Sequence, residues 1–166
     1  MKFTGTKNID ILKNVVGISS SVSITTANNC WLGLFTTMPS GVSGSGGVEP
    51  SAADNYERME IHSMMSETYK SYSQGEASAT THTDRVGNAY NINFNVAIDP
   101  DDDTVVTGQD WGTIVGVGLF SSRTAATPYA WASLETPVSV PTGWGLRFLP
   151  GRFEISIDEI VANAST

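Results

Sequence analysis

The chain has 166 residues, of which 16% are charged, and a formal net charge of -8 from 9 Lys+Arg against 17 Asp+Glu. This acidic balance argues against a nucleic-acid-binding protein, whose footprint is basic, and no uncharged apolar run approaches the ~20 residues of a membrane helix. The lone Cys30 excludes an intramolecular disulfide scaffold. This length fits one domain, and the low charge with many Gly, Ser and Thr favours short strands and turns over amphipathic helices.

The first 28 residues form an expected N-terminal helical arm and linker. Lys13 and Asn14 interrupt the apolar run before it reaches the length of a signal-peptide core, which predicts a protein made and used without secretion. A short helix is expected over 7–16, where four apolar residues share one face: Ile9, Leu12, Val15 and Val16. This face packs either on the domain's own core or on a neighbouring subunit, and in the second case it is a subunit contact.

Residues 29–160 carry the pattern of a β domain, because short alternating or apolar segments are bounded by turn residues. The expected strands are 30–36, 56–62, 90–98, 113–120, 129–134, 138–140, 143–149 and 151–158. Segment 30–36 is apolar on both faces and is expected to be central. The glycines within 113–120 indicate close backbone approach or a bend. The last two strands are expected to pair through the turn Leu149–Arg152.

Two segments between the strands are less regular. The Gly/Ser/Pro-rich stretch 39–51 is expected to be a long loop. Residues 63–87 are expected to be an insertion, partly loop, in which one helix face could hold four side chains: Met64, Met65, Tyr69 and Tyr72. With a flexible tail at 161–166, these expectations give an all-β fold: a single β-sandwich, jelly-roll-like, with a short N-terminal helix.

No local motif predicts a catalytic residue, a cofactor site or a metal site. The acidic run Asp99–Asp103 is either a solvated turn or a cation site, and it lacks the glycine and glutamate positions of an EF-hand loop. His62 and His82 are far apart and have no further zinc ligands at metal-binding spacing. There is no nucleophile elbow and no phosphate loop. Glu57 and Glu60 could form a glycosidase pair only at a separation that the sequence does not give.

The four tryptophans, Trp31, Trp111, Trp131 and Trp144, allow two interpretations. Large rings most often fill a core or a subunit contact. Alternatively, exposed rings stack on sugar faces, and on that interpretation Tyr129 and Trp144 are the glycan contacts to expect near loops.

Several segments in fixed order carry a resemblance to a known family. In chain order they are Trp31–Thr37, Gly46–Ser51, Tyr56–Ile61, Asp110–Ile114, Gly118–Phe120, Tyr129–Leu134, Gly145–Phe148 and Gly151–Ile155. Together they resemble small virion structural proteins of tailed bacteriophages, of the phage tail fiber type. The resemblance covers about 30–158, and 63–87 looks longer than that family's pattern.

The resemblance implies a non-enzymatic structural or adaptor component of the virion, in a fiber, collar, neck or tail-associated position. Its implied partners are further copies of itself and other virion proteins, with no nucleic acid, no membrane and no cofactor, and its implied place is the virion, assembled in the host cytoplasm.

Two alternatives stay open. One is a receptor- or carbohydrate-binding module at a fiber tip with a host surface glycan as ligand, and the other is a cell-wall or capsule hydrolase.

Overall fold

A computed structural model describes residues 2–3, 30–41, 43–82, 85–94 and 110–156 of the chain. The helix expected over 7–16, the acidic run 99–103 and the tail 161–166 lie outside the described residues. The chain divides into two compact units. The first unit comprises residues 1–63 and 92–147, and the second comprises 64–91 and 148–166.

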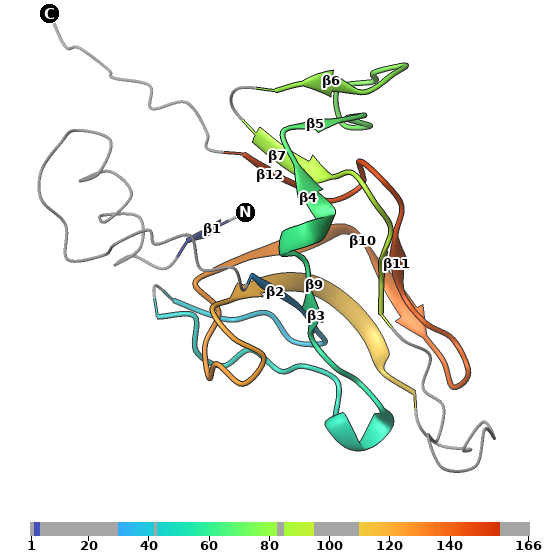
Figure 1. Ribbon diagram of the computed structural model, residues 1–166. Coiled ribbons are helices and arrows are strands. Elements are labelled where there is room, and N and C mark those ends of the chain that lie inside the picture. The colour runs from blue at the N-terminus through green and yellow to red at the C-terminus, as the bar shows by residue number, and fades with distance from the viewer. Residues whose placement is uncertain (1, 4–29, 42, 83–84, 95–109, 157–166) are drawn as a thin grey trace, which may run out of the picture. The chain divides into compact units, whose positions relative to one another are not determined.

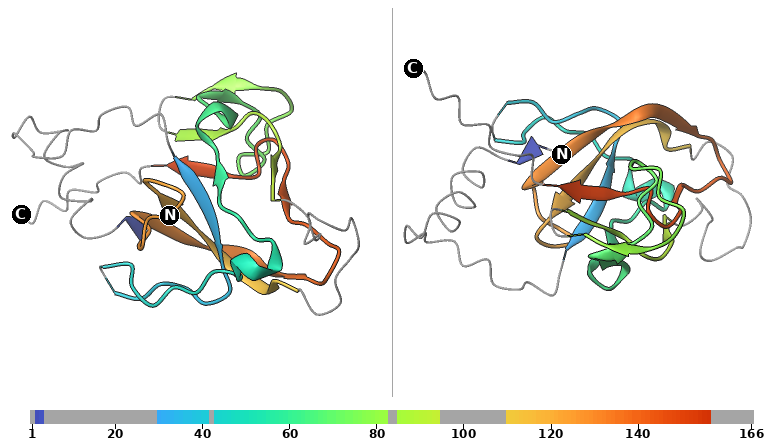
Figure 2. Two further views of the ribbon diagram at one scale, coloured as in Figure 1. Left: turned by 60° about the horizontal axis from the view of Figure 1, so that its bottom comes forward. Right: turned by 90° about the horizontal axis from the view of Figure 1, so that it is seen from above.

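The first unit is built on a five-stranded antiparallel sheet with the strand order β1-β10-β9-β2-β3. Its strands are β1 (Lys2–Phe3), β2 (Trp31–Phe35), β3 (Met59–Glu60), β9 (Gly112–Phe120) and β10 (Ala130–Val140). Figure 1 and both views of Figure 2 show β9 and β10 running side by side along their length, with β2 on the other side of β9. The predicted strands at 30–36 and 113–120 are confirmed, and β2 is central, as its two-sided apolar pattern predicts.

Strand β10 joins two segments that the sequence pattern separates, 129–134 and 138–140. The register with β9 shifts between Ser133 and Val138, so that one irregular strand replaces the two expected ones. Pro137 lies within this irregularity, where a missing backbone N–H costs the ladder least.

Glycines let side chains pack directly on the middle of this sheet. A Cβ at Gly118 would lie 2.6 Å from the Phe35 ring, and one at Gly116 would lie 2.1 Å from the Met38 sulfur. Phe35 is buried with Phe120 and Trp131 in one apolar cluster. The prediction of close approach at the glycines of 113–120 is therefore confirmed.

The second unit contains short antiparallel ladders. Strand β7 (Arg85–Asn88) lies between β12 (Glu154–Ser156) and β4 (Met65–Ser66), and β5 (Thr68–Tyr69) pairs with β6 (Thr80–Thr81). A further two-stranded ladder is formed by β8 (Ile92–Asn93), of the first unit, and β11 (Arg147–Phe148), within which the boundary between the units falls. Two single turns of 3-10 helix, η1 (Ala52–Asp54) and η2 (His62–Met64), complete the described elements.

The helix face proposed for part of 63–87 is wrong. Met64 ends η2, Met65 lies in β4 and Tyr69 in β5, while Tyr72 belongs to no helix. Met65 and Tyr69 instead lie in strands that pair with β7 and β6, and this long-range pairing outweighs their apparent helical spacing.

The final hairpin is also wrong in its pairing, although its turn is present. The Arg152 amide donates to the Leu149 carbonyl at 3.0 Å, and Gly151 takes a φ of +72°. However, β11 pairs with β8, and β12 pairs with β7. The physical reason is Asn88, whose buried side chain bonds to residues on both sides of the turn, as described below.

The all-β prediction holds as several small antiparallel sheets, with no helix of seven or more residues and no closed barrel in the described ranges. Two expected strands are shorter in the structure. Only β3 is a strand within 56–62, and only β8 is a strand within the described part of 90–98. A single jelly-roll-like sandwich, the N-terminal helix and the domain limits at 28, 63–87 and 160 stay predictions.

Candidate functional site

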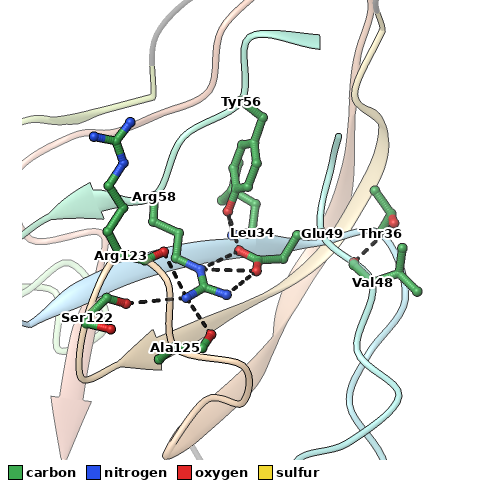
Figure 3. A network of polar contacts seen from close by, with 9 residues as sticks. All are labelled: Leu34, Thr36, Val48, Glu49, Tyr56, Arg58, Ser122, Arg123 and Ala125. Carbon is green, nitrogen blue, oxygen red and sulfur yellow. Dashed lines mark hydrogen bonds and ion pairs between the residues drawn. The ribbon is translucent and has the colours of Figure 1, made fainter. Parts of the chain in front are cut away.

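A network of polar contacts in the first unit ties two loops to the central strand β2 (Figure 3). The Arg58 guanidinium donates through Nε to both carboxylate oxygens of Glu49, each at 3.1 Å. The same guanidinium donates through Nη1 to three backbone carbonyls of the loop after β9: Ser122, Arg123 and Ala125. Its plane lies 3.4 Å from the centre of the Phe120 ring, an arginine–aromatic stack that leaves the in-plane donors free for these acceptors.

Tyr56 completes the network from the other side of Glu49. Its hydroxyl donates to Glu49 Oε1 at 2.6 Å and accepts from the backbone amide of Leu34 at 2.7 Å. Burial, and next the negative charge of Glu49, raise the pKa of Tyr56 well above its usual value. The ring stacks on Phe94 and meets the edge of Trp111.

The space for this network is made by a glycine. A Cβ at Gly33 would lie 2.4 Å from Glu49 Oε1 and 2.7 Å from the Phe120 ring. Both Glu49 oxygens are engaged by Arg58 or Tyr56, so the carboxylate anchors the loop 39–51. Two backbone hydrogen bonds fix this loop further. The Thr36 amide donates to the Val48 carbonyl, and the Val48 amide donates to the Thr37 carbonyl.

The other carboxylates singled out by sequence lie in different surroundings. Glu57 is exposed and makes an ion pair with Arg123. Glu60 lies in the edge strand β3 opposite Trp31. Within the described ranges, no group of three or more His, Cys, Asp or Glu is placed to hold a metal ion, and no helix is long and apolar enough to cross a membrane.

The two residues expected as glycan contacts differ in environment. Tyr129 is partly buried, and its hydroxyl lies 2.9 Å from the Cys30 sulfur. Burial raises the pKa of both the Cys30 thiol and the Tyr129 hydroxyl. Trp144 is 67% exposed on a turn in which its amide donates to the Pro141 carbonyl at 3.0 Å. The apolar face expected at Ile9, Leu12, Val15 and Val16 lies outside the described residues.

The remaining tryptophans have structural positions. Trp111 and Trp131 are buried, and the Trp111 ring nitrogen donates to the Asp54 carbonyl at 2.8 Å. Trp31 packs against the Phe35 cluster. The core interpretation therefore fits these three rings, and Trp144 is the exception.

Sequence reasoning missed the Glu49–Arg58–Tyr56 network and a set of exposed apolar side chains in the second unit. The available signal for the network was a lone Glu in a Gly/Pro-rich loop followed closely by Tyr-Glu-Arg. The exposed set comprises Tyr72, Val86, Tyr90 and Leu149.

Comparison with known proteins gives one family. A search of curated proteins found no match to the chain. The sequence model of a family described as podophage GP4 fiber I protein gp80 matches residues 11–156, which is most of the chain. The match agrees with the segments 30–158 that resemble phage tail fiber proteins and with the structural use of Glu49. The chain therefore belongs to this family of bacteriophage fiber proteins, which are structural, non-enzymatic components of the virion.

Proposed function

We propose that the chain is a fiber subunit that acts by protein–protein assembly, joining copies of itself and neighbouring virion proteins in a fiber, collar, neck or tail-associated position. The observation that carries the proposal is the family match over residues 11–156. Fibers are built from repeated subunits, and symmetric self-association is the commonest way in which such chains assemble.

Two features of the described residues support an assembly role. The polar network at Glu49 and Arg58 stabilises the subunit internally, which leaves outward-facing groups for contacts. Large apolar side chains are exposed in the first unit, with Val48 at 51%, Val138 at 41% and Trp144 at 67%. Exposed apolar groups mark interaction sites when they gather into a patch, and a partner surface would remove them from water.

Self-association is tested by light scattering after size exclusion. We expect a defined oligomer for the full chain and a monomer for the variant Ile9→Ser/Leu12→Ser/Val16→Ser, because these changes remove the apolar face of the expected N-terminal helix. The matched control Ile9→Val/Leu12→Met/Val16→Ile keeps the face apolar and should keep the oligomer. A full chain that is monomeric at all concentrations would refute self-association, and an unchanged oligomer in the serine variant would place the contact elsewhere.

A second candidate, a receptor- or carbohydrate-binding module at a fiber tip, is favoured by Trp144. Its ring projects from a turn fixed by the Gly143 φ of +79° and the Pro141 carbonyl bond. Tyr129, the other expected glycan contact, is less available because Cys30 engages its hydroxyl. Calorimetric titration with neutral oligosaccharides should show binding to wild type, weaker binding to Trp144→Phe, and none to Trp144→Ala. An equal response from Trp144→Ala would exclude this site.

A further inference from the structure

Two cations meet at one exposed tyrosine in the second unit. The Lys70 ammonium lies 4.7 Å from the centre of the Tyr72 ring, and the Arg152 guanidinium carbon lies 4.2 Å from it. Tyr72 is 41% exposed, so the cluster is open to solvent. Each cation is attracted to the ring, and two positive charges beside one exposed ring favour an anion nearby.

The cluster is held in place by the backbone. Tyr72 donates its amide to the Gly151 carbonyl at 3.4 Å, which joins the two segments that carry the cations. A Cβ at Gly151 would lie 1.7 Å from the Lys70 carbonyl oxygen, so only glycine permits this approach. The Gly151 amide in turn donates to the buried Asn88 carbonyl at 2.7 Å. Arg152 is therefore presented from a fixed turn, to which the segment that carries Lys70 and Tyr72 is hydrogen-bonded, and this order lowers the entropy lost on binding a ligand.

The carboxylates of this unit are engaged elsewhere. Glu154 accepts from the hydroxyls of Ser71 and Ser73, each at 2.6 Å, and pairs with Arg85. Glu76 accepts from the Ser71 amide and lies 3.3 Å from His82. Among the residues that the structure describes, Lys70 and Arg152 have no carboxylate within ion-pair distance.

This combination fits an oxyanion carried on a sugar. A guanidinium stacked on a ring keeps its in-plane N–H groups free to bind a carboxylate or phosphate with two hydrogen bonds. The exposed part of the tyrosine supplies an amphipathic surface for the rest of the ligand. A net charge of -8 disfavours a dense polyanion, which is repelled by the chain as a whole. We propose that Lys70, Tyr72 and Arg152 form a binding site for an acidic saccharide, with its carboxylate or phosphate on the Arg152 guanidinium and with Lys70 adding positive charge beside the same ring.

This site uses residues other than Trp144, and the proposal does not depend on the assembly role. The test is calorimetric titration of the full chain at low salt with trigalacturonic acid as the carboxylate probe and mannose 6-phosphate as the phosphate probe. Maltotriose is the neutral control, and triglutamate is the non-sugar acid. We expect binding of at least one acidic sugar, weaker binding of that sugar as salt rises, and no binding of maltotriose that depends on Arg152.

The variants separate a built site from general charge attraction. Arg152 is exposed, so Arg152→Gln should fold normally and bind the acidic sugar about tenfold more weakly. Arg147→Gln removes the same charge from an exposed position outside the cluster and should leave the affinity unchanged. Tyr72→Ala should also weaken binding, with its fold checked by circular dichroism.

Four results would overturn the proposal: no binding of either acidic sugar, equal binding of triglutamate, equal losses from Arg152→Gln and Arg147→Gln, or full affinity in Arg152→Gln. Which of the two acidic sugars binds more tightly identifies the oxyanion that the site prefers. A full chain that binds the acidic sugar but is monomeric at all concentrations would refute the assembly proposal alone.

Discussion

Replacing Asn88 with leucine should unfold the turn that follows β11. The Asn88 side chain is fully buried. Its Nδ2 donates to the carbonyls of Tyr90 at 2.8 Å and Leu149 at 2.9 Å, with a longer contact to Phe148 at 3.3 Å, and its Oδ1 accepts from the Phe153 amide at 2.9 Å. One amide side chain therefore joins three parts of the second unit.

The magnitude follows from these bonds. Leucine has a similar volume, so packing changes little, but three good hydrogen bonds at roughly 1 kcal/mol each are lost, which gives about 3 kcal/mol. This is a large part of the roughly 5–15 kcal/mol that stabilises a typical domain. The Phe153 amide is the group most affected, because Asn88 Oδ1 is its acceptor.

Native-state hydrogen exchange measures the effect where it arises. The Gly151 and Phe153 amides should exchange on the order of 100-fold faster in Asn88→Leu than in wild type. The Leu34 amide, which donates to Tyr56 in the first unit, is the internal reference and should change less. The matched variant Asn93→Leu alters an exposed asparagine and should have little effect. Exchange at Phe153 within threefold of wild type would refute the argument that Asn88 holds the turn.

Three further predictions concern the network in Figure 3. Arg58→Met should lower the free energy of unfolding in urea by about 3 kcal/mol, because it leaves Glu49 without its partner. The double variant Glu49→Leu/Arg58→Met should lose less than the sum of the two single variants, and additive losses would argue against coupling. Gly33→Ala should cost roughly 2 kcal/mol, since its Cβ would overlap Glu49, whereas a neutral result would mean that the loop moves away freely. The raised pKa of Tyr56 means that its contribution is fully present below the ordinary tyrosine value of 10.0 and is lost as pH rises above it. Tyr56→Phe should therefore reduce the slope of stability against pH in that alkaline range, and an unchanged slope would contradict the assignment.

The sheet of the first unit was largely predictable, for reasons that are local. Segment 30–36 is apolar at successive positions, which a strand buried on both faces requires, and it became β2 between β3 and β9. The glycines of β9 indicated close approach, and Phe35 and Met38 fill the space. Both inferences use only sequence neighbours and the period of a strand.

The second unit was poorly predictable, because its organisation depends on contacts between distant residues. The turn at Leu149–Arg152 was readable from Pro-Gly, but its strands pair with β8 and β7. Nothing in the sequence around Asn88 shows that its amide bonds to residues some 60 positions later. The role of Arg58 could not be predicted for the same reason, because its three backbone acceptors lie on a loop more than 60 residues away.

The use of charge in this chain bears on where its contacts with other molecules lie. Only 9 residues are Lys or Arg, and Arg58, Arg85 and Arg123 each have a carboxylate partner in the described structure. Two of these few cations lie beside Tyr72. They add little stability there, because exposed cation–π contacts contribute only about 0.5–1 kcal/mol and the two charges repel each other. In the first unit Arg58 closes loops over the sheet, whereas in the second unit Lys70 and Arg152 lie beside the exposed Tyr72 ring. The binding chemistry of this fiber protein is therefore better sought on the turn that Asn88 holds than on the Gly/Ser-rich loop 39–51, whose carboxylate is already engaged.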